Sequence, residues 1–425
     1  MANPVCWRMV PVFQNHGLLN MSSLYDPDRH VPLTDTGWSV DGARAEIADI
    51  LRDIADGRQA DGGWPLHPLD RESYPADGTK WALYAGAAGV VIGTEILRRA
   101  GSAAPDLRAD LPLFHENYRR DPDVGVAEAG LQIGELGILV PAILAAPGDE
   151  VLSQRAEHCM QALISHPAWE VTSGQTGMMY AALALYRATG QERWKTHYLA
   201  GADALFDAWT EHAEGGGWLW QNRIFGEERN YLGACHGVAG NLNVLLRGRD
   251  LLPAQMIETA MARAAETLAR HAQWHDGLAN WYASAPPVQG RLFMQWCHGA
   301  PGIVMALSPA PMDGSDAARM LDELIGAAGQ LVWQAGPLKK GAGLCHGTAG
   351  NGYAFLAMYR RTGKTVWLDR ARAFAAHGVE QLRQHRREFA QARFSLMTGD
   401  VGLAVYLHHC LHPAEAAMPG LEIFN

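Results

Sequence analysis

The chain has 425 residues, of which 48% are hydrophobic and 19% are charged. It can therefore bury a large core, and its composition excludes intrinsic disorder. The formal net charge of −10, with histidine neutral, argues against a nucleic-acid-binding surface, which needs clustered Lys and Arg. The first ten residues lack an apolar core of signal-peptide length, and the longest apolar run, 138–147, is too short to span a bilayer. We therefore expect a cytoplasmic protein without a transmembrane segment.

Residues 1–42 are interpreted as an N-terminal arm, and residues 43–425 as one repeat domain. A Gly-x-x-Gly pair recurs along that domain at steps of about 40 to 63 residues, the scale of a two-helix repeat. The pairs are Gly86/Gly89, Gly134/Gly137, Gly174/Gly177, Gly237/Gly240, Gly299/Gly302, Gly347/Gly350 and Gly399/Gly402. Composition alone gives roughly five such pairs by chance, so the flanking sequence carries the argument.

Each pair is followed by a stretch that is apolar nearly all round, as expected for a helix buried inside a larger assembly. These stretches are 90–97, 138–144, 178–186, 241–246, 303–307, 351–359 and 403–411. Between them lie amphipathic, Ala-rich segments that predict outer helices with one wet face. They are 43–55, 151–165, 194–212, 253–275, 316–332 and 366–390. Residues 103–126 are the least regular, and β-branched alternation is scarce throughout.

Alternation of inner and outer helices over about seven hairpins predicts an all-α fold, an α/α toroid or double α-barrel. An open superhelix is the alternative. Glycine at the turn that enters each inner helix allows close backbone approach and positive φ. In a toroid all these turns lie at one end, so residues distant in sequence would meet around a central mouth.

Three consecutive turns carry the same tripeptide: Cys235-His236-Gly237, Cys297-His298-Gly299 and Cys345-His346-Gly347. Cys and His are the side chains that bind zinc best. Six candidates are thus available for about four coordination positions. A catalytic zinc takes three protein ligands and keeps one position open. This reasoning suggests two Cys and one His, but it does not say which.

The stretches 296–302, Trp-Cys-His-Gly-Ala-Pro-Gly, and 343–351, Gly-Leu-Cys-His-Gly-Thr-Ala-Gly-Asn, resemble the lanthionine synthetase C (LanC) family, and its LanC-like branch most of all. The resemblance runs from about residue 43 to residue 411. It implies an α/α toroid with Zn²⁺ in the central mouth. It also implies addition of a thiol, from glutathione or a peptide Cys, to dehydroalanine or dehydrobutyrine in a peptide or protein.

Carried over by residue, the resemblance implies Cys297, Cys345 and His346 as zinc ligands and His236 as the acid/base. Glu170 matches an acidic position that is usually Asp in peptide cyclases and tends to be Glu in the LanC-like branch. Lys340 matches a lysine that contacts glutathione.

Two neighbouring residues are given other roles. Cys235 stands where family members often have a small apolar residue, and we interpret it as a buried bystander, with a second thiol near the metal as the alternative. His298 is expected to support the structure around the metal rather than to bind it.

Other functions remain open at this stage. The chain could be a lanthionine-ring-forming cyclase proper, or a non-catalytic glutathione- or peptide-binding protein with structural zinc. Protein prenyltransferase β-subunits and toroidal glycosidases are further α/α toroids. They need an Asp-Cys-His set and paired carboxylates respectively, and the Cys-His turns fit neither well.

Overall fold

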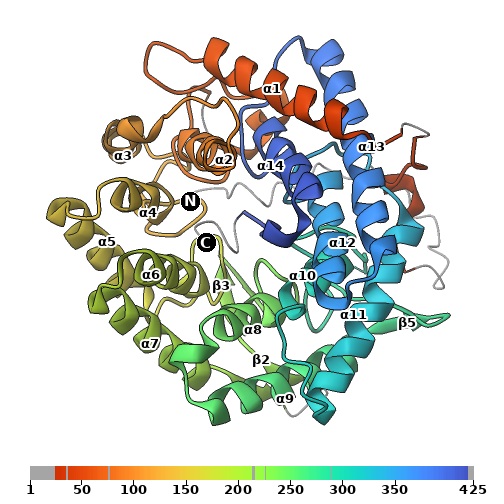
Figure 1. Ribbon diagram of the computed structural model, residues 1–425. Coiled ribbons are helices and arrows are strands. Elements are labelled where there is room, and N and C mark those ends of the chain that lie inside the picture. The colour runs from red at the N-terminus through yellow and green to blue at the C-terminus, as the bar shows by residue number, and fades with distance from the viewer. Residues whose placement is uncertain are drawn as a thin grey trace.

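The computed structural model describes residues 24–34, 37–74, 77–212, 216–224, 226–288 and 290–419. The α-helices of these residues form two concentric rings, and successive helices along the chain belong alternately to the outer and the inner ring (Figure 1). The inner helices are α2 (Ala87–Arg99), α4 (Leu136–Ala145), α6 (Gln175–Thr189), α8 (Val238–Arg247), α10 (Ala300–Leu307), α12 (Thr348–Thr362) and α14 (Asp400–Leu411). The outer helices are α1 (Val40–Asp56), α3 (Leu111–Arg120), α5 (Glu150–Leu163), α7 (Glu192–Asp207), α9 (Ala254–His271), α11 (Asp316–Ala335) and α13 (Thr365–Phe389).

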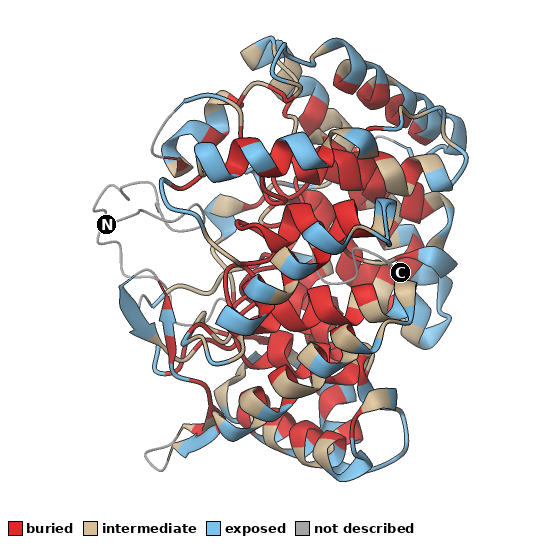
Figure 2. Cartoon of the chain, turned by 90° about the vertical axis from the view of Figure 1, so that its left-hand side faces the viewer, coloured by how far each residue is buried: buried red, intermediate tan, exposed pale blue. Residues whose placement is uncertain are grey.

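The rings close. Each inner helix contacts the next inner helix, and α14 contacts α2, while the first outer helix, α1, packs on α14. This confirms the toroid of seven helical hairpins and excludes the open superhelix. Helix α10 is buried along its whole length, as its apolar sequence predicts. Helix α1 instead buries residues at helical spacing, such as Ile47, Ile50 and Ile54, and exposes its other face. Figure 2 shows the buried residues gathered inside the outer ring.

The repeated glycines mark the N-terminal ends of the inner helices. The first glycine of the pair is the N-cap of six of them, and in α4 it directly precedes the N-cap Glu135. At each second glycine, an added Cβ would lie well inside 3.0 Å of the carbonyl oxygen six residues earlier. The turn before each helix therefore folds back onto the first helical turn, which only glycine permits. The expected positive φ is found at one first glycine, Gly299, where φ is 99°.

This close approach predicts a large stability difference between two glycine variants. In Gly350→Ala the new Cβ meets the backbone oxygen of Leu344, so we expect a loss of about 2–4 kcal/mol in the free energy of unfolding. In the matched control Gly326→Ala, on outer helix α11, nothing lies within 4 Å of the new Cβ, and we expect a gain of up to about 1 kcal/mol. Denaturant unfolding of the metal-free proteins measures both, and equal effects would contradict this packing.

Backbone hydrogen bonds join six of the seven pairs of neighbouring turns before the inner helices. Amide nitrogens donate to carbonyl oxygens from Tyr84 to Gln132 (2.8 Å), Gln132 to Thr172 (2.8 Å), Val171 to Cys235 (2.9 Å), Cys297 to Cys345 (3.4 Å), Cys345 to Met397 (2.8 Å) and Met397 to Tyr84 (3.1 Å). Between the remaining two turns, a Cβ at Gly233 would lie 2.6 Å from the Cys297 carbonyl oxygen. The turns therefore form a closed ring at one end of the toroid, as the sequence predicted.

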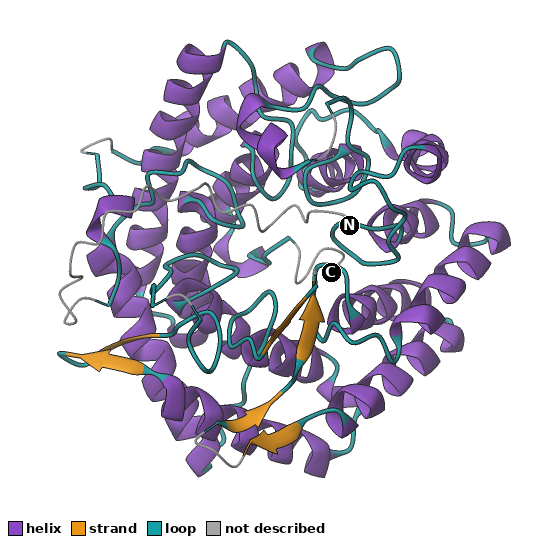
Figure 3. Ribbon diagram, turned by 180° about the vertical axis from the view of Figure 1, so that it is seen from behind, coloured by secondary structure: helices purple, strands orange, loops and turns teal. Residues whose placement is uncertain are grey.

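Some segments differ from the sequence-based prediction. The irregular segment 103–126 contains α3, an outer helix that was not among the six predicted from the sequence. Helices α7 and α9 end earlier than predicted, and the chain continues into short antiparallel hairpins (Figure 3). The strand pairs are β1 (Thr210–His212) with β2 (Gly217–Leu219), β3 (Asn222–Ile224) with β4 (Glu227–Arg229), and β5 (Gln273–His275) with β6 (Leu278–Asn280). Five short 3-10 turns complete the described elements: Pro27–Arg29, Pro68–Ser73, Arg108–Asp110, Arg249–Leu251 and Pro413–Glu415.

Most of the predicted N-terminal arm, residues 1–42, lies outside the described residues, namely 1–23 and 35–36. Residues 24–34, which we call the strap, lie against two of the turns. The Asn280 side chain donates to the Leu24 carbonyl oxygen (2.7 Å), and Lys339 N donates to the Arg29 carbonyl oxygen (2.9 Å). His30 and Leu338 form an antiparallel bridge. Among the described helices, none combines the length and apolar character needed to cross a bilayer.

Candidate functional site

The three Cys-His turns precede the neighbouring inner helices α8, α10 and α12. Because the closed ring of turns holds them side by side, residues from about 170 to 346 meet at one end of the toroid. Cys235, Cys297 and Cys345 are all buried and all outside disulfides. The toroid thus brings cysteines and histidines that are distant in sequence to a common place.

Cys297 and Cys345, the two predicted thiolate ligands, lie on hydrogen-bonded turns. The Cys297 amide nitrogen is 3.4 Å from the Cys345 carbonyl oxygen, and the two residues are 3% and 0% exposed. His346 follows directly and is half-buried. Burial, with a smaller contribution from the positive charges of Lys340, Arg393 and Arg29, holds the pKa of His346 well below its usual value. The imidazole is therefore neutral, which is the form that binds a metal.

The side-chain donors of these three residues do not all lie within 4.8 Å of one another in the described part of the chain. Their backbones are adjacent, but their ligand atoms are not gathered on one point. Assignment of Cys297, Cys345 and His346 as zinc ligands therefore stays a prediction.

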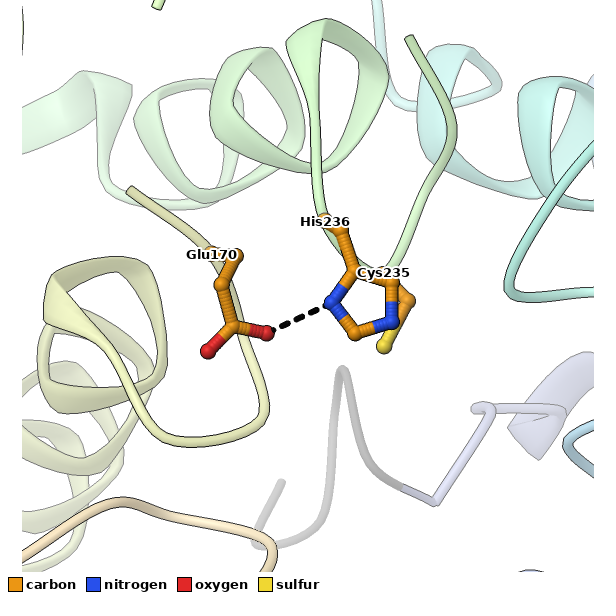
Figure 4. Close-up of side chains that lie close together, drawn as sticks. All are labelled: Glu170, Cys235 and His236. Carbon is orange, nitrogen blue, oxygen red and sulfur yellow. Dashed lines mark hydrogen bonds and ion pairs between the residues drawn. The ribbon is translucent and has the colours of Figure 1, made fainter. Parts of the chain in front are cut away.

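Glu170 and His236, the two predicted catalytic residues, form a fully buried pair (Figure 4). Glu170 lies in the turn before α6, and His236 lies in the turn before α8. His236 Nδ1 is 2.8 Å from Glu170 Oε2. The carboxylate also accepts hydrogen bonds from Thr172 N (2.7 Å), Ser173 N (2.6 Å) and Ser173 Oγ (3.0 Å). The pair is thus held by the backbone of one turn.

The electrostatics of this pair fix the imidazole tautomer. Burial would raise the pKa of Glu170, but hydrogen bonds from His236, Ser173 and Thr172 outweigh it and hold the pKa below its usual range. An ionised carboxylate can only accept, so the Nδ1 of His236 carries the proton that it donates. A proton exchanged with a substrate would therefore pass through the other ring nitrogen, Nε2.

Glu170, Cys235 and His236 together could also hold a metal ion, because one ligand atom from each lies within 4.8 Å of the others. This brings Cys235, interpreted from the sequence as a bystander, to the Glu170–His236 pair. Both oxygens of Glu170 already accept two hydrogen bonds each, and Cys235 Sγ lies 3.2 Å from Thr172 Oγ1. A metal here would displace at least one of the bonds to Glu170.

His298 packs its ring on that of His236, with centroids 5.4 Å apart and an interplanar angle of 29°. The rings of Tyr231 and Phe293 also pack on the His298 ring, each with its centroid 5.9 Å from that of His298. Burial and the neighbouring His236 hold the pKa of His298 well below its usual value. His298 thus joins the turn of His236 to the turn of Cys297.

Lys340 is exposed in the turn that leads to Cys345. Its positive charge contributes to lowering the pKa of His346. A contact between Lys340 and a thiol substrate stays a prediction.

Sequence reasoning missed two residues beside Cys297. Gln295 donates from Nε2 to Cys297 Sγ (3.1 Å), and Arg29, on the strap, donates from Nη2 to Gln295 Oε1 (3.2 Å). Gln295 could have been considered from the sequence, because it lies two residues before Cys297. No sequence signal connects Arg29 with a residue 266 positions away.

Comparison with known proteins supports one family. The family profile described as "Lanthionine synthetase C-like protein" matches residues 79–423. The chain is 29% identical over 257 residues to "Glutathione S-transferase LANCL1" of Danio rerio, covering 60% of this chain and 62% of that protein. It is 29% identical over 262 residues to "LanC-like protein GCL1" of Arabidopsis thaliana, covering 60% and 58%. Each alignment thus spans about three fifths of the relative.

A solved structure, "Nisin cyclase", is similar with a TM-score of 0.63 at 12% identity, covering 90% of this chain and 98% of that one. At this identity the likeness concerns the fold alone, and it agrees with the closed helical toroid described above.

Proposed function

This chain belongs to the lanthionine synthetase C-like family, and we propose that it adds a thiol to a dehydroalanine or dehydrobutyrine residue of a peptide or protein, with zinc as cofactor. The observation that carries the proposal is the buried Glu170–His236 pair, held in the same closed ring of turns as Cys297 and Cys345. An oriented acid/base in one ring of turns with two cysteines that could bind zinc suits thiol addition. We further propose that the reaction occurs in the cytoplasm, where free thiols stay reduced.

Cys297, Cys345 and His346 would hold the zinc. The donor set fits the ion: two buried sulfurs on hydrogen-bonded turns and a neutral imidazole supply three ligands, which leaves one position for a substrate. When bound, zinc would lower the pKa of an incoming thiol and so favour the thiolate nucleophile. The ligand atoms would have to converge from two turns whose backbones are hydrogen-bonded to each other.

His236 would act as the acid. As the thiolate sulfur bonds to the β-carbon of the dehydro residue, the π electrons of the C=C bond move onto the carbonyl group and form an enolate. His236 would deliver a proton from Nε2 to the α-carbon and regain one released by the next thiol. The Glu170 carboxylate, at 2.8 Å from Nδ1, stabilises the imidazolium that this cycle requires. The product is a thioether that contains every atom of the thiol and of the alkene, because no group leaves.

Glutathione is the thiol that we propose. Lys340 lies in the turn leading to Cys345, where its ammonium group could pair with a carboxylate of such a substrate. The relative from Danio rerio carries the name glutathione S-transferase. The alternative thiol is a Cys of the same peptide, as in ring formation by a cyclase.

Incubation with two dehydroalanine peptides, one with and one without an internal Cys, tests the proposal. With glutathione present, we expect the peptide without Cys to gain the mass of one glutathione in a zinc-dependent reaction. Loss of the alkene at unchanged mass, seen only for the peptide with Cys, would favour the cyclase. No thioether with either peptide, at full zinc loading, would contradict catalysis and favour a non-catalytic binding protein.

A further inference from the structure

We propose that Gln295 is a positioning residue for the sulfur of Cys297, and that Arg29 of the strap fixes its orientation. The inference rests on the proposed function, because it assigns Gln295 a role toward a zinc-bound thiolate. Neither residue belongs to the set that the sequence singled out.

The donor and acceptor roles in the two hydrogen bonds of the Gln295 side-chain amide follow from the chemistry of Arg29. An arginine guanidinium has only donors, so the Gln295 group that faces Arg29 must be the carbonyl oxygen, at 3.2 Å. The NH₂ group of the same amide therefore faces Cys297, and Sγ accepts its hydrogen bond at 3.1 Å. Gln295 is only 9% exposed, so water does not compete freely for these groups.

Arg29 contacts both of the turns that lead to the predicted thiolate ligands. Its guanidinium lies 4.9 Å from the centre of the Phe293 ring, in the turn that leads to Cys297. Its carbonyl oxygen accepts from Lys339 N (2.9 Å), in the turn that leads to Cys345. The strap thus connects the two turns that carry the predicted thiolate ligands. Movement of either turn would disturb the contact between Arg29 and Gln295.

The hydrogen bond has a chemical consequence. An N–H group that donates to a metal-bound thiolate withdraws electron density from the sulfur and orients it. A dehydroamino acid is an electrophile that any nucleophilic sulfur can attack, including the zinc ligands themselves. By making the Cys297 sulfur a weaker nucleophile, Gln295 would direct the addition to the incoming thiol. It would thereby protect the enzyme from alkylation by its own substrate.

Alkylation of the zinc-loaded protein with iodoacetamide, read by peptide mass spectrometry at Cys297, tests this role. We expect Gln295→Met, which keeps the side-chain length but removes the donor, to be alkylated at Cys297 about tenfold faster than the parent protein. In the cobalt-substituted protein we expect the sulfur-to-metal charge-transfer band to move to longer wavelength, because the sulfur donates electrons more readily. Gln255→Met, at an exposed position of α9, is the matched control and should change neither readout.

Arg29→Met supplies an independent variant that leaves Gln295 in place but frees its amide to rotate. It should move both readouts in the same direction as Gln295→Met, and Arg29→Lys should move them less. Unchanged alkylation and an unchanged band in Gln295→Met and Arg29→Met, with zinc retained, would overturn the inference alone. A parent protein that binds no zinc, or whose Cys297 is alkylated equally with and without zinc, would overturn the proposed function instead.

Discussion

Replacing Cys345 with alanine is expected to release the zinc and to lower thioether formation by more than about a thousandfold. Cys345 is fully buried in the turn before α12, and its backbone joins the turns of Cys297 and Met397. Loss of one of three ligands leaves too few donors to hold the ion against water. Metal analysis of the purified variant and mass spectrometry of the product measure the two effects.

The matched control is Cys159→Ala, which also removes a buried thiol. Cys159 is 2% exposed on outer helix α5, and burial raises the pKa of its thiol to about 12, so it is protonated and unsuited to bind metal. We expect modest destabilisation with zinc and activity retained. A Cys345→Ala protein that keeps its full zinc content would contradict the proposed ligand set.

Replacing His236 with glutamine is expected to lower turnover by about 10²–10⁴-fold while zinc stays bound. Glutamine can still donate a hydrogen bond toward Glu170, which limits the cost of leaving a buried carboxylate without its partner. The loss should therefore appear in the rate of proton delivery. Steady-state kinetics with a dehydroalanine peptide, together with zinc content, separate the two quantities.

Glu170→Gln completes this comparison. It removes the charge that stabilises the imidazolium but keeps the shape of the side chain, so we expect a smaller fall in turnover than for His236→Gln, again with zinc retained. If both variants lose the metal, the ion is held by Glu170, Cys235 and His236. In that case the pair is a metal site and not an acid with its partner.

Much of the toroid could be predicted because each hairpin repeats one local rule. The turn before each inner helix folds back so closely that its second glycine has no room for a side chain, and this constraint leaves a visible mark in the sequence. Outer helix α3 was missed because it has only 10 residues, begins Leu-Pro and is polar over much of its length. The three β-hairpins were missed because strands of three residues are too short to show an alternation of apolar and polar residues.

The site was predictable only in part. Repetition of Cys-His-Gly marked three turns, but the choice among six side chains came from a family resemblance. Pairing of Glu170 with His236 joins residues 66 positions apart, and the bond from Arg29 to Gln295 joins residues 266 apart. Such contacts follow from closure of the ring and from the path of the strap over it. No local pattern encodes either of them.

X-ray absorption spectroscopy at the zinc edge, on protein loaded with one equivalent of zinc and free of added thiol, tests the proposed ligand set directly. We expect two sulfur ligands at about 2.3 Å and one imidazole nitrogen, with water in the fourth position. Addition of glutathione should raise the sulfur count to three. A single sulfur accompanied by carboxylate oxygen and imidazole would place the ion at Glu170, Cys235 and His236, and would contradict zinc binding by Cys297, Cys345 and His346.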